Sequence, residues 1–432
     1  MRKMKDSGVA WLESIPETWN LLQLGSLFLE HKHKNVGMQS SNLLSLSYGK
    51  IIQKNINATD GLLPESFEGY NVIDAGDIVL RLTDLQNDQR SLRIGLCGES
   101  GIITSAYTTL RRRNDALNSK YFYYLLHSYD IRKGFYGMGA GVRQGLNYAG
   151  VRKIMLTVPP ESEQTAIAEC LDRKTAQVDA LISNVQAQIE KLKAYKQSLI
   201  TEVVTKGLDP NVPMMDSGVE WIGEIPVSWG IAKLQYCAKI RSGITLGKKY
   251  PDDAELIKRP YLRVANVQNG GVVLDDLKTI EVSTEEDAQY RLSAGEVLMT
   301  EGGDRDKLGR GCVWLGQVEP CLHQNHIFAL RTNKLLNPYF LSYVTASKIG
   351  RVYFDITAIK TTNLACTNSS KVLAFKLPLP SAGEQQQMVD YLDRQVDKID
   401  KLISAKQSKI EKLEQYKRSL IYEYVTGKKE VS

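Results

Sequence analysis

The sequence predicts an α+β chain that is built twice. Two mixed α/β regions are expected, separated by two long antiparallel coiled-coil helices and related by an internal pseudo-twofold repeat. The first observation is that DSGVAWLESIPETW at Asp6 returns as DSGVEWIGEIPVSW at Asp216. The second is that a stretch without glycine or proline from Glu163 returns from Glu384, sharing EQ, LDR, LIS, IEKL, YK and SLI without a gap. Self-similarity on this scale indicates a duplicated architecture.

The copied segments alternate with regions that differ in length and sequence between the two halves. This alternation divides the chain into four parts. We expect a first variable region at 1–160, a first shared helix at 161–206, a second variable region at 207–380 with a short linker at its start, and a second shared helix with a C-terminal tail at 381–432.

The shared segment is predicted to form a coiled-coil helix. Its apolar residues step by alternating threes and fours, which is typical of a helix-pairing seam. The predicted seam positions are Val178, Ile182, Val185, Ile189, Leu192, Lys196 and Leu199 in the first copy, and Ile399, Ile403, Ile410, Leu413, Lys417 and Leu420 in the second. Lys196 and Lys417 occupy the same seam slot. A lysine there either fixes register and partner or extends its long stem past the seam to water.

The linker decides how the two helices run. A helix of about 43 residues is ~65 Å long, whereas the ten or so residues from Lys206 to Asp216 span at most ~35 Å. The second variable region is therefore expected at the far end of the first helix, and the second helix returns antiparallel. Ser381 and Glu384 fit a capping box at the start of that helix.

The variable regions are predicted to share one fold while differing in surface. NVIDAGDIVLRL near Asn71 and YRLSAGEVLMT near Tyr290 each place a glycine turn before an apolar strand. NSKYFYYLLHSY at Asn118 and NPYFLSYVTAS at Asn337 read as matching short helices. In the second of these, Asn337 is expected to cap the helix, with Pro338 in its first turn.

Composition is ordinary for a globular chain, with 43% hydrophobic and 24% charged residues. No apolar run approaches the roughly 18–20 residues of a membrane span, and no apolar stretch follows the basic N-terminus, so we expect a cytoplasmic protein without a secretion signal. The six cysteines form no CxxC pair, which favours reduced, mostly buried thiols. A net charge of +6 permits an anionic partner without requiring one.

Several catalytic patterns nearly appear, but each lacks an essential part. FYGMGAG at Phe135 has the spacing of an S-adenosylmethionine loop but does not follow a buried strand, and NPYF at Asn337 lacks the second proline of an adenine methyltransferase loop. Pro251-Asp252 with Asp276-Leu277-Lys278 has only the loose spacing of a nuclease motif. A zinc site from Cys312, Cys321, His323 and His326 would lack familiar ligand spacings. We therefore expect no catalytic site, cofactor or metal.

Basic and amide side chains near glycines suit DNA contacts. Lysine and arginine bind phosphates, arginine pairs with guanine, and asparagine or glutamine pairs with adenine. For any single residue the alternative is a solvated surface charge. The candidates are Arg90, Arg93, Arg111, Arg143, Gln144 and Asn147 in the first variable region, and Lys248, Lys249, Arg305, Lys307, Arg310, Gln324, Asn325, Lys360 and Asn363 in the second.

The junction GLDPNVPMMDSGVEWIGEIPVSW, the P-x-x-x-EQ entry to each shared helix and the IEKL…YK…SLI run resemble the DNA-specificity (S) subunit of type I restriction–modification systems. The resemblance covers essentially the whole chain. It implies two target-recognition domains, each reading one half of a bipartite, asymmetric site in double-stranded DNA, and two helices that set the gap between the halves. It also implies docking of two methyltransferase (M) subunits, with restriction/translocase (R) subunits in the full complex. Adenine methylation and cleavage would belong to those partners.

Two rival classes remain open at this stage. A stand-alone methyltransferase or nuclease would act on DNA without other subunits. A coiled-coil adaptor would bind protein only and show no salt-dependent DNA binding. The sequence determines neither the bases read, nor the spacer length, nor whether a functional nuclease accompanies the chain.

Overall fold

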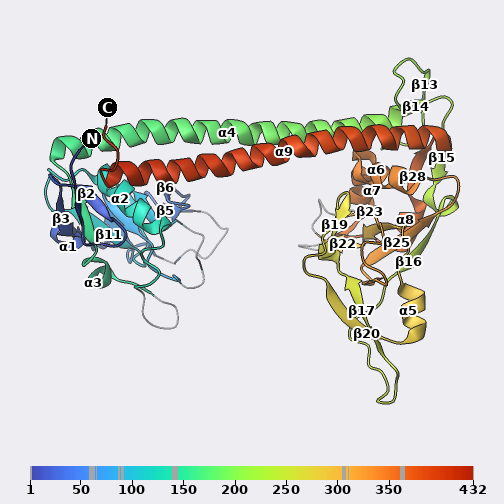
Figure 1. The fold of residues 1–432 in the computed structure, drawn as a ribbon, viewed down its shortest axis with the longest axis horizontal. Helices are drawn as coiled ribbons and strands as arrows, with labels where there is room; N and C mark the ends of the chain where they lie inside the picture. Colours follow the sequence, from blue (N-terminus) through green and yellow to red (C-terminus); the bar gives the residue numbers. More distant parts are fainter. Residues whose placement is uncertain are drawn as a thin grey trace. The chain divides into compact units, whose positions relative to one another are not determined.

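The structure is a computed structural model of the full chain (Figure 1). It describes residues 2–57, 64, 66–85, 88, 92–138, 145–303, 308–309, 311–360 and 365–431. The chain forms two compact units. The first unit comprises residues 1–186 and 408–432, and the second comprises 187–407. These units cut across the four segments expected from the sequence, because each contains one variable region together with part of both long helices.

The first unit combines short antiparallel strands with helices. Its elements are β1 (Met4–Asp6), β2 (Ser14–Pro16), β3 (Asn20–Gln23), α1 (Leu24–Leu27), β4 (Phe28–Glu30), β5 (Leu44–Ser47), β6 (Lys50–Gln53), β7 (Asn71–Ile73), β8 (Ile78–Leu80), β9 (Ile94–Leu96), β10 (Gly101–Ile103), β11 (Thr108–Arg112), α2 (Ser119–Ile131), α3 (Tyr148–Val151), β12 (Met155–Val158) and the start of α4 (Glu161–Lys206).

The second unit contains the end of α4 and the start of α9 (Ala382–Val425). Between them lie β13 (Met214–Asp216), β14 (Glu224–Pro226), β15 (Gly230–Lys233), η1 (Leu234–Tyr236), β16 (Ala238–Ser242), β17 (Ile257–Leu262), η2 (Val264–Asn266), β18 (Val267–Gln268), β19 (Gly271–Val272), β20 (Lys278–Val282), α5 (Thr284–Tyr290), β21 (Val297–Thr300), β22 (Gly302–Gly303), β23 (Gly311–Val313), β24 (Leu322–His323), β25 (Ile327–Thr332), α6 (Pro338–Ala346), α7 (Lys348–Thr357), β26 (Ile359–Lys360), β27 (Ala365–Cys366), α8 (Ser369–Ala374) and β28 (Lys376–Leu379).

The two units have the same strand order. The central sheet is β4-β11-β8-β9 in the first and β16-β25-β21-β23 in the second. In each, a hairpin from the copied opening motif (β1–β2 or β13–β14) precedes a strand that pairs with the one before the long helix (β3–β12 or β15–β28). The variable regions therefore share a fold, as the sequence predicts. The helix α5 precedes β21 in the second unit, whereas no helix lies between β4 and β8 in the described residues of the first.

The glycine turns and helix caps expected from the sequence are present. Gly76 before β8 and Gly295 before β21 have φ of +92° and +90°, values that a side chain would strain. Asn118 and Asn337 cap α2 and α6 through their side chains. Ser381 and Glu384 form the predicted capping box of α9, since each accepts a hydrogen bond from the other's backbone N–H.

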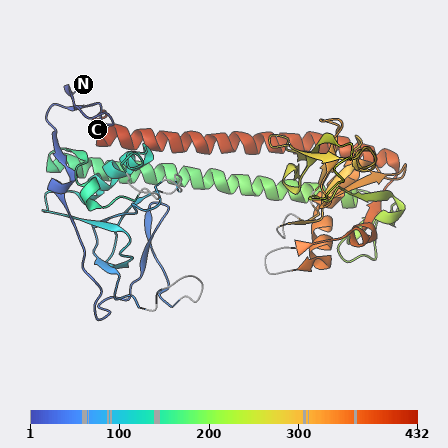
Figure 2. The ribbon, with the colours of Figure 1, turned by 90° about the horizontal axis from the view of Figure 1, so that it is seen from below.

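The core of each unit lies between its central sheet, a short helix and the long helices. In the first unit Tyr121 of α2 packs with Leu420 and Val425 from the end of α9. In the second, Phe340 of α6 packs with Leu199 and Val203 from the end of α4. Figure 2 shows the strands of the first unit (blue to cyan) to one side of the start of α4 and the end of α9. Each long helix thus completes the core of a unit at its C-terminal end.

The copied opening motif and the copied helix start contact each other. Trp19 Nε1 donates to Glu163 Oε2 at 2.9 Å, and Trp229 Nε1 donates to Glu384 Oε1 at 3.1 Å. The next residue of each EQ pair, Gln164 or Gln385, is buried and receives the N–H of the capping asparagine. The two separate copied segments therefore form one joint in each unit, which explains why both were retained.

The predicted seam residues face between the long helices within each unit. Val178, Val185, Ile189, Leu199, Ile399, Ile410 and Leu420 are buried, and Ile182, Leu192, Lys196, Ile403, Leu413 and Lys417 are half-buried. In the second unit Lys196 contacts Asp400, and Gln188 contacts Lys406. Because residue numbers rise along α4 where they fall along α9, the two helices run antiparallel within the second unit.

In the described part of the chain, no helix has both the length and the apolar character that crossing a membrane requires. All six cysteines are free, and five of them are buried, as the sequence predicts; Cys366 is exposed.

Candidate nucleic-acid interface

Three of the candidate DNA-contacting segments meet at one end of the second unit. The Glu301 N–H donates to the His326 carbonyl at 2.9 Å, and the Thr367 N–H donates to the Glu301 carbonyl at 2.8 Å. Strand β22 pairs with β27, which also pairs with β26. The ladders thus place the residues before 304, after 364 and around 325 side by side. Arg305, Lys307, Arg310 and Asn363 lie outside the described residues, as does the side chain of Lys360.

Gln324 and Asn325 are fixed at this end by their backbone. The N–H of Gln324 donates to Leu262, and that of Asn325 donates to Ile244, each at 2.9 Å. Gly243 allows this close approach, because a Cβ there would lie 2.0 Å from the His323 carbonyl oxygen. Both side chains are half-buried. The structure therefore fixes the backbone of two neighbouring amide-bearing residues at this end of the unit.

The first unit has the same arrangement at the corresponding end. The Leu146 N–H donates to the Leu82 carbonyl at 2.9 Å, as Thr367 does to Glu301. The segments leaving β8 and entering α3 are thereby joined. Arg90, Arg143 and Gln144 lie outside the described residues. Asn147 is exposed and caps α3 by accepting the Gly150 N–H, so its side-chain oxygen already has a structural partner.

The expectation that Arg93 contacts DNA is wrong for this structure. Its side chain is completely buried. All five N–H donors of its guanidinium are used inside the protein: the acceptors are the carbonyls of Arg81, Thr83, Asp84 and Asp88 and the hydroxyl of Tyr136. Sequence analysis included Arg93 because it is a basic residue near glycines in a variable region, and such residues suit phosphate contacts.

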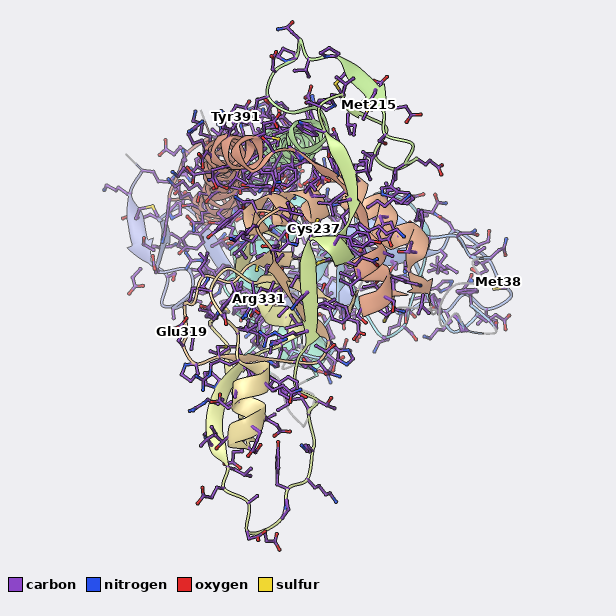
Figure 3. All side chains as sticks on the ribbon, turned by 90° about the vertical axis from the view of Figure 1, so that its right-hand side faces the viewer. Met38, Met215, Cys237, Glu319, Arg331 and Tyr391 are labelled. Carbon is purple, nitrogen blue, oxygen red and sulfur yellow. The ribbon has the colours of Figure 1, made fainter. Side chains whose placement is uncertain are left out.

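Arg111 also has a structural partner rather than an open surface position. Its guanidinium binds the buried carboxylate of Asp77, with Nε–Oδ1 and Nη2–Oδ2 distances of 2.9 and 2.6 Å, and it reaches Asp74 as well. The hydrogen bond to Asp77 is the main reason that the pKa of Arg111 is raised. In the second unit Arg331 (labelled in Figure 3) donates through Nη2 to the buried Glu296 at 3.2 Å and to Ser293 at 3.0 Å. Arg111 is therefore a half-buried, ion-paired residue of the first unit.

Lys248 and Lys249 differ in their surroundings. Lys248 pairs with Glu286 at 2.5 Å, and Tyr250 donates to the other oxygen of that carboxylate at 2.6 Å. Burial alone would raise the pKa of Glu286, but the hydrogen bonds from Lys248 and Tyr250 lower it below its usual value. Lys249 is exposed. Of the two, Lys249 is the better placed to meet a phosphate.

The structure does not assemble the weak zinc candidates. Cys312, Cys321 and His323 are buried, and burial lowers the pKa of His323 to about 4. His326 instead pairs with Glu301 at 2.7 Å. Within the described ranges, no three His, Cys, Asp or Glu side chains are grouped as metal ligands would be.

Sequence analysis missed residues that act at joints rather than on surfaces. Examples are Gln164 and Gln385 at the helix starts. Others are Asp172 and Asp393, which accept hydrogen bonds from the hydroxyls of Tyr124 and Tyr343 at 2.7 and 2.6 Å. Their signal was present, since each pair recurs at corresponding positions in the two copies.

The chain is similar to proteins of type I restriction systems along most of its length. Residues 226–412 match the family described as type I restriction modification DNA specificity domain. The MjaVIII type I restriction enzyme specificity subunit of Methanocaldococcus jannaschii is 24% identical over 426 residues, covering 96% of this chain and 93% of that protein. The EcoBI specificity subunit of Escherichia coli is 25% identical over 337 residues, covering 74% and 68%.

A chain of a solved structure described as the structural basis of complex assembly and conformational transition of the type I R-M system has the same fold. Its TM-score is 0.69 at 16% identity, covering 96% of this chain and 99% of that one. Residues 226–412 thus carry the match to a type I restriction modification DNA specificity domain. Along most of its length the chain is similar to proteins named as specificity subunits of type I restriction enzymes.

Proposed function

We propose that this chain selects the DNA site of a type I restriction–modification complex, with each unit reading one half of a bipartite, asymmetric site. The observation that carries the proposal is the shared backbone frame at one end of both units, where Leu146 joins Leu82 and Thr367 joins Glu301. The residues attached to this frame differ between the copies. One scaffold with two different sets of polar side chains suits two different half-sites.

The long helices are proposed to set the spacer and to dock two methyltransferase subunits, with restriction subunits joining the full complex. Their paired seams support the first role, because a continuous helix is a stiff spacer of fixed rise per residue. Similarity to specificity subunits of type I restriction enzymes supports the second. In this arrangement the chain directs adenine methylation and restriction, and its partners carry out the chemistry.

The test is to express the chain with the methyltransferase subunit of its system and map methyladenine across the host genome. We expect one two-part motif with a fixed unread gap, absent when this chain is omitted. Lys401→Ala is a matched control, because Lys401 is exposed and pairs along its own helix with Asp397. Methylation that persists unchanged without the chain would leave a protein-binding adaptor instead.

The spacer role has a separate test. Inserting seven residues after Gln186 and seven after Gln407 preserves the seam repeat and lengthens both helices by ~10 Å. This corresponds to roughly three base pairs at ~3.4 Å each. We expect the unread gap to grow by about that amount while both half-sites stay the same. An insertion in one helix only is the control, and it should abolish methylation by breaking the pairing.

A further inference from the structure

In the first unit, backbone carbonyls of the loop after β8 bind the buried guanidinium of Arg93. Arg93 stands immediately before β9, and its Nη1 donates to the carbonyls of Arg81 and Thr83 at 3.2 and 2.6 Å. Its Nη2 donates to the carbonyls of Asp84, at 3.2 Å, and Asp88. These acceptors come from positions 81–84 and from 88, so their convergence on one guanidinium ties the described residues of this loop to a single point.

A second group of contacts fixes Arg93 itself. The Arg93 backbone N–H donates to Asp130 Oδ2 at 2.7 Å, and its Nε donates to the Tyr136 hydroxyl at 3.0 Å. The guanidinium also lies over the Tyr136 ring, 5.2 Å from its centre. Both partners belong to α2 or the turn after it, within the core of the unit. Arg93 therefore links the loop to α2 and to the turn that follows α2.

Stability alone does not account for this arrangement. The guanidinium is surrounded mainly by neutral carbonyls, and burying a charge in this way costs free energy that an apolar side chain would not cost. A buried polar network in which every donor is satisfied instead specifies one conformation among alternatives. The loop conformation is thus the feature that Arg93 secures.

The loop belongs to the candidate interface. Leu82 lies between two residues whose carbonyls Arg93 binds. Its own carbonyl accepts a hydrogen bond from the N–H of Leu146, the residue before the candidate Asn147. In sequence, Arg310 precedes β23 as Arg93 precedes β9, although Arg310 lies outside the described residues. We infer that Arg93 is a positioning residue for DNA recognition by the first unit, acting through the loop rather than by touching DNA. This inference rests on the proposed function.

The test uses Arg93→Lys in the full chain, expressed with the methyltransferase subunit, with methyladenine mapping as the readout. A lysine keeps the charge but cannot hold four carbonyls in a planar fork. We expect complex assembly, the spacer and the second half-site to be unchanged. Discrimination against single mismatches in the first half-site, typically about 10- to 100-fold, should fall several-fold. Tyr136→Phe removes one contact of the same network and should produce a smaller loss in that half-site alone.

Arg112→Lys is the matched control. Arg112 also donates to backbone carbonyls, those of Asp115 and Leu117, but at the surface and away from this loop. It should leave both half-sites intact. The inference would be overturned if both Arg93→Lys and Tyr136→Phe kept full discrimination between bases. Equal loss of discrimination in both half-sites would also overturn it, and so would failure of both variants to assemble. If methyladenine mapping with the unmodified chain gives no two-part motif, the proposed function is wrong. The inference about Arg93, which rests on that function, is then wrong as well.

Discussion

Lys196 and Asp400 form an ion pair between the two long helices within the second unit. The Lys196 Nζ lies 2.7 Å from each carboxylate oxygen of Asp400. In the first unit Lys417 and Asp179, which occupy the corresponding positions of the repeat, make the same pair at 2.6 and 2.7 Å. Each helix thus supplies the lysine of one pair and the aspartate of the other. This favours a register role for the seam lysines over simple extension of their stems to water.

Removing one partner should loosen the helix pairing slightly. Asp400→Asn is expected to cost about 0.5 kcal/mol, because both side chains are partly exposed. Amide hydrogen exchange in α4 and α9 of the second unit should accelerate about twofold. Exchanging the charges with Lys196→Asp and Asp400→Lys should restore most of the protection. Asp397→Asn is the control, since Asp397 pairs with Lys401 on its own helix; an equal effect there would contradict a register role.

Gln385 should be far more sensitive than its neighbour Gln386. The buried Gln385 accepts the Asn337 N–H at 2.8 Å and donates to the carbonyls of Pro380 and Leu335. Gln385→Leu leaves these groups unsatisfied, so the free energy of unfolding of the second unit should fall by about 3 kcal/mol. Urea denaturation followed by tryptophan fluorescence measures this. Gln386→Leu, at an exposed position, should change it by less than about 0.5 kcal/mol.

Arg111 should stabilise the first unit rather than bind DNA. Arg111→Met leaves the Asp77 carboxylate buried without its counter-ion, which should cost about 2 kcal/mol. The double variant Asp77→Asn/Arg111→Met should recover at least half of that loss. Urea denaturation measures both. A phosphate contact would behave differently: its loss would reduce the salt dependence of DNA binding by about one unit of slope with little change in stability.

Asp130 should make the stability of the first unit depend on pH. Burial raises the pKa of its carboxyl from 3.8 to about 6, although the Arg93 N–H and charge oppose this. Since the folded state holds the proton more tightly, this group's contribution is fully present below about pH 4 and is lost as pH rises through 6. Asp130→Asn lacks this loss and can still accept the Arg93 N–H. Its stability relative to the unmodified chain should therefore rise by about 2 kcal/mol between pH 4 and 7. A pH-independent difference in thermal unfolding would contradict this.

The sequence allowed the repeated elements to be predicted well. The alternating steps of three and four from Val178 to Leu199 fix which face of α4 is apolar, and the absence of glycine and proline fixes its continuity. Caps at Asn337 and Ser381 are equally local, because a cap and the amide it binds lie within three residues. Such features follow from spacing along the chain alone.

Side-chain partners were not predictable in the same way. Arg93 and Lys249 are both basic residues in variable regions, yet one is fully buried and the other exposed. Nothing in local spacing distinguishes them, because the carbonyls that bind Arg93 are brought together only when the loop closes. The same holds for Arg111, whose acidic partners lie more than thirty residues away in the sequence.

By itself, then, the sequence determined the duplication, the heptad seam and the matching elements of the two variable regions, since periodicity and repetition are properties of the chain. Only the tertiary structure decided that Lys196 meets Asp400, that Trp19 meets Glu163 and that Arg93 is enclosed by its own loop. The physical reason is that each of these contacts depends on where packing places distant backbone segments. The sequence around a charged or amide side chain does not identify its partner.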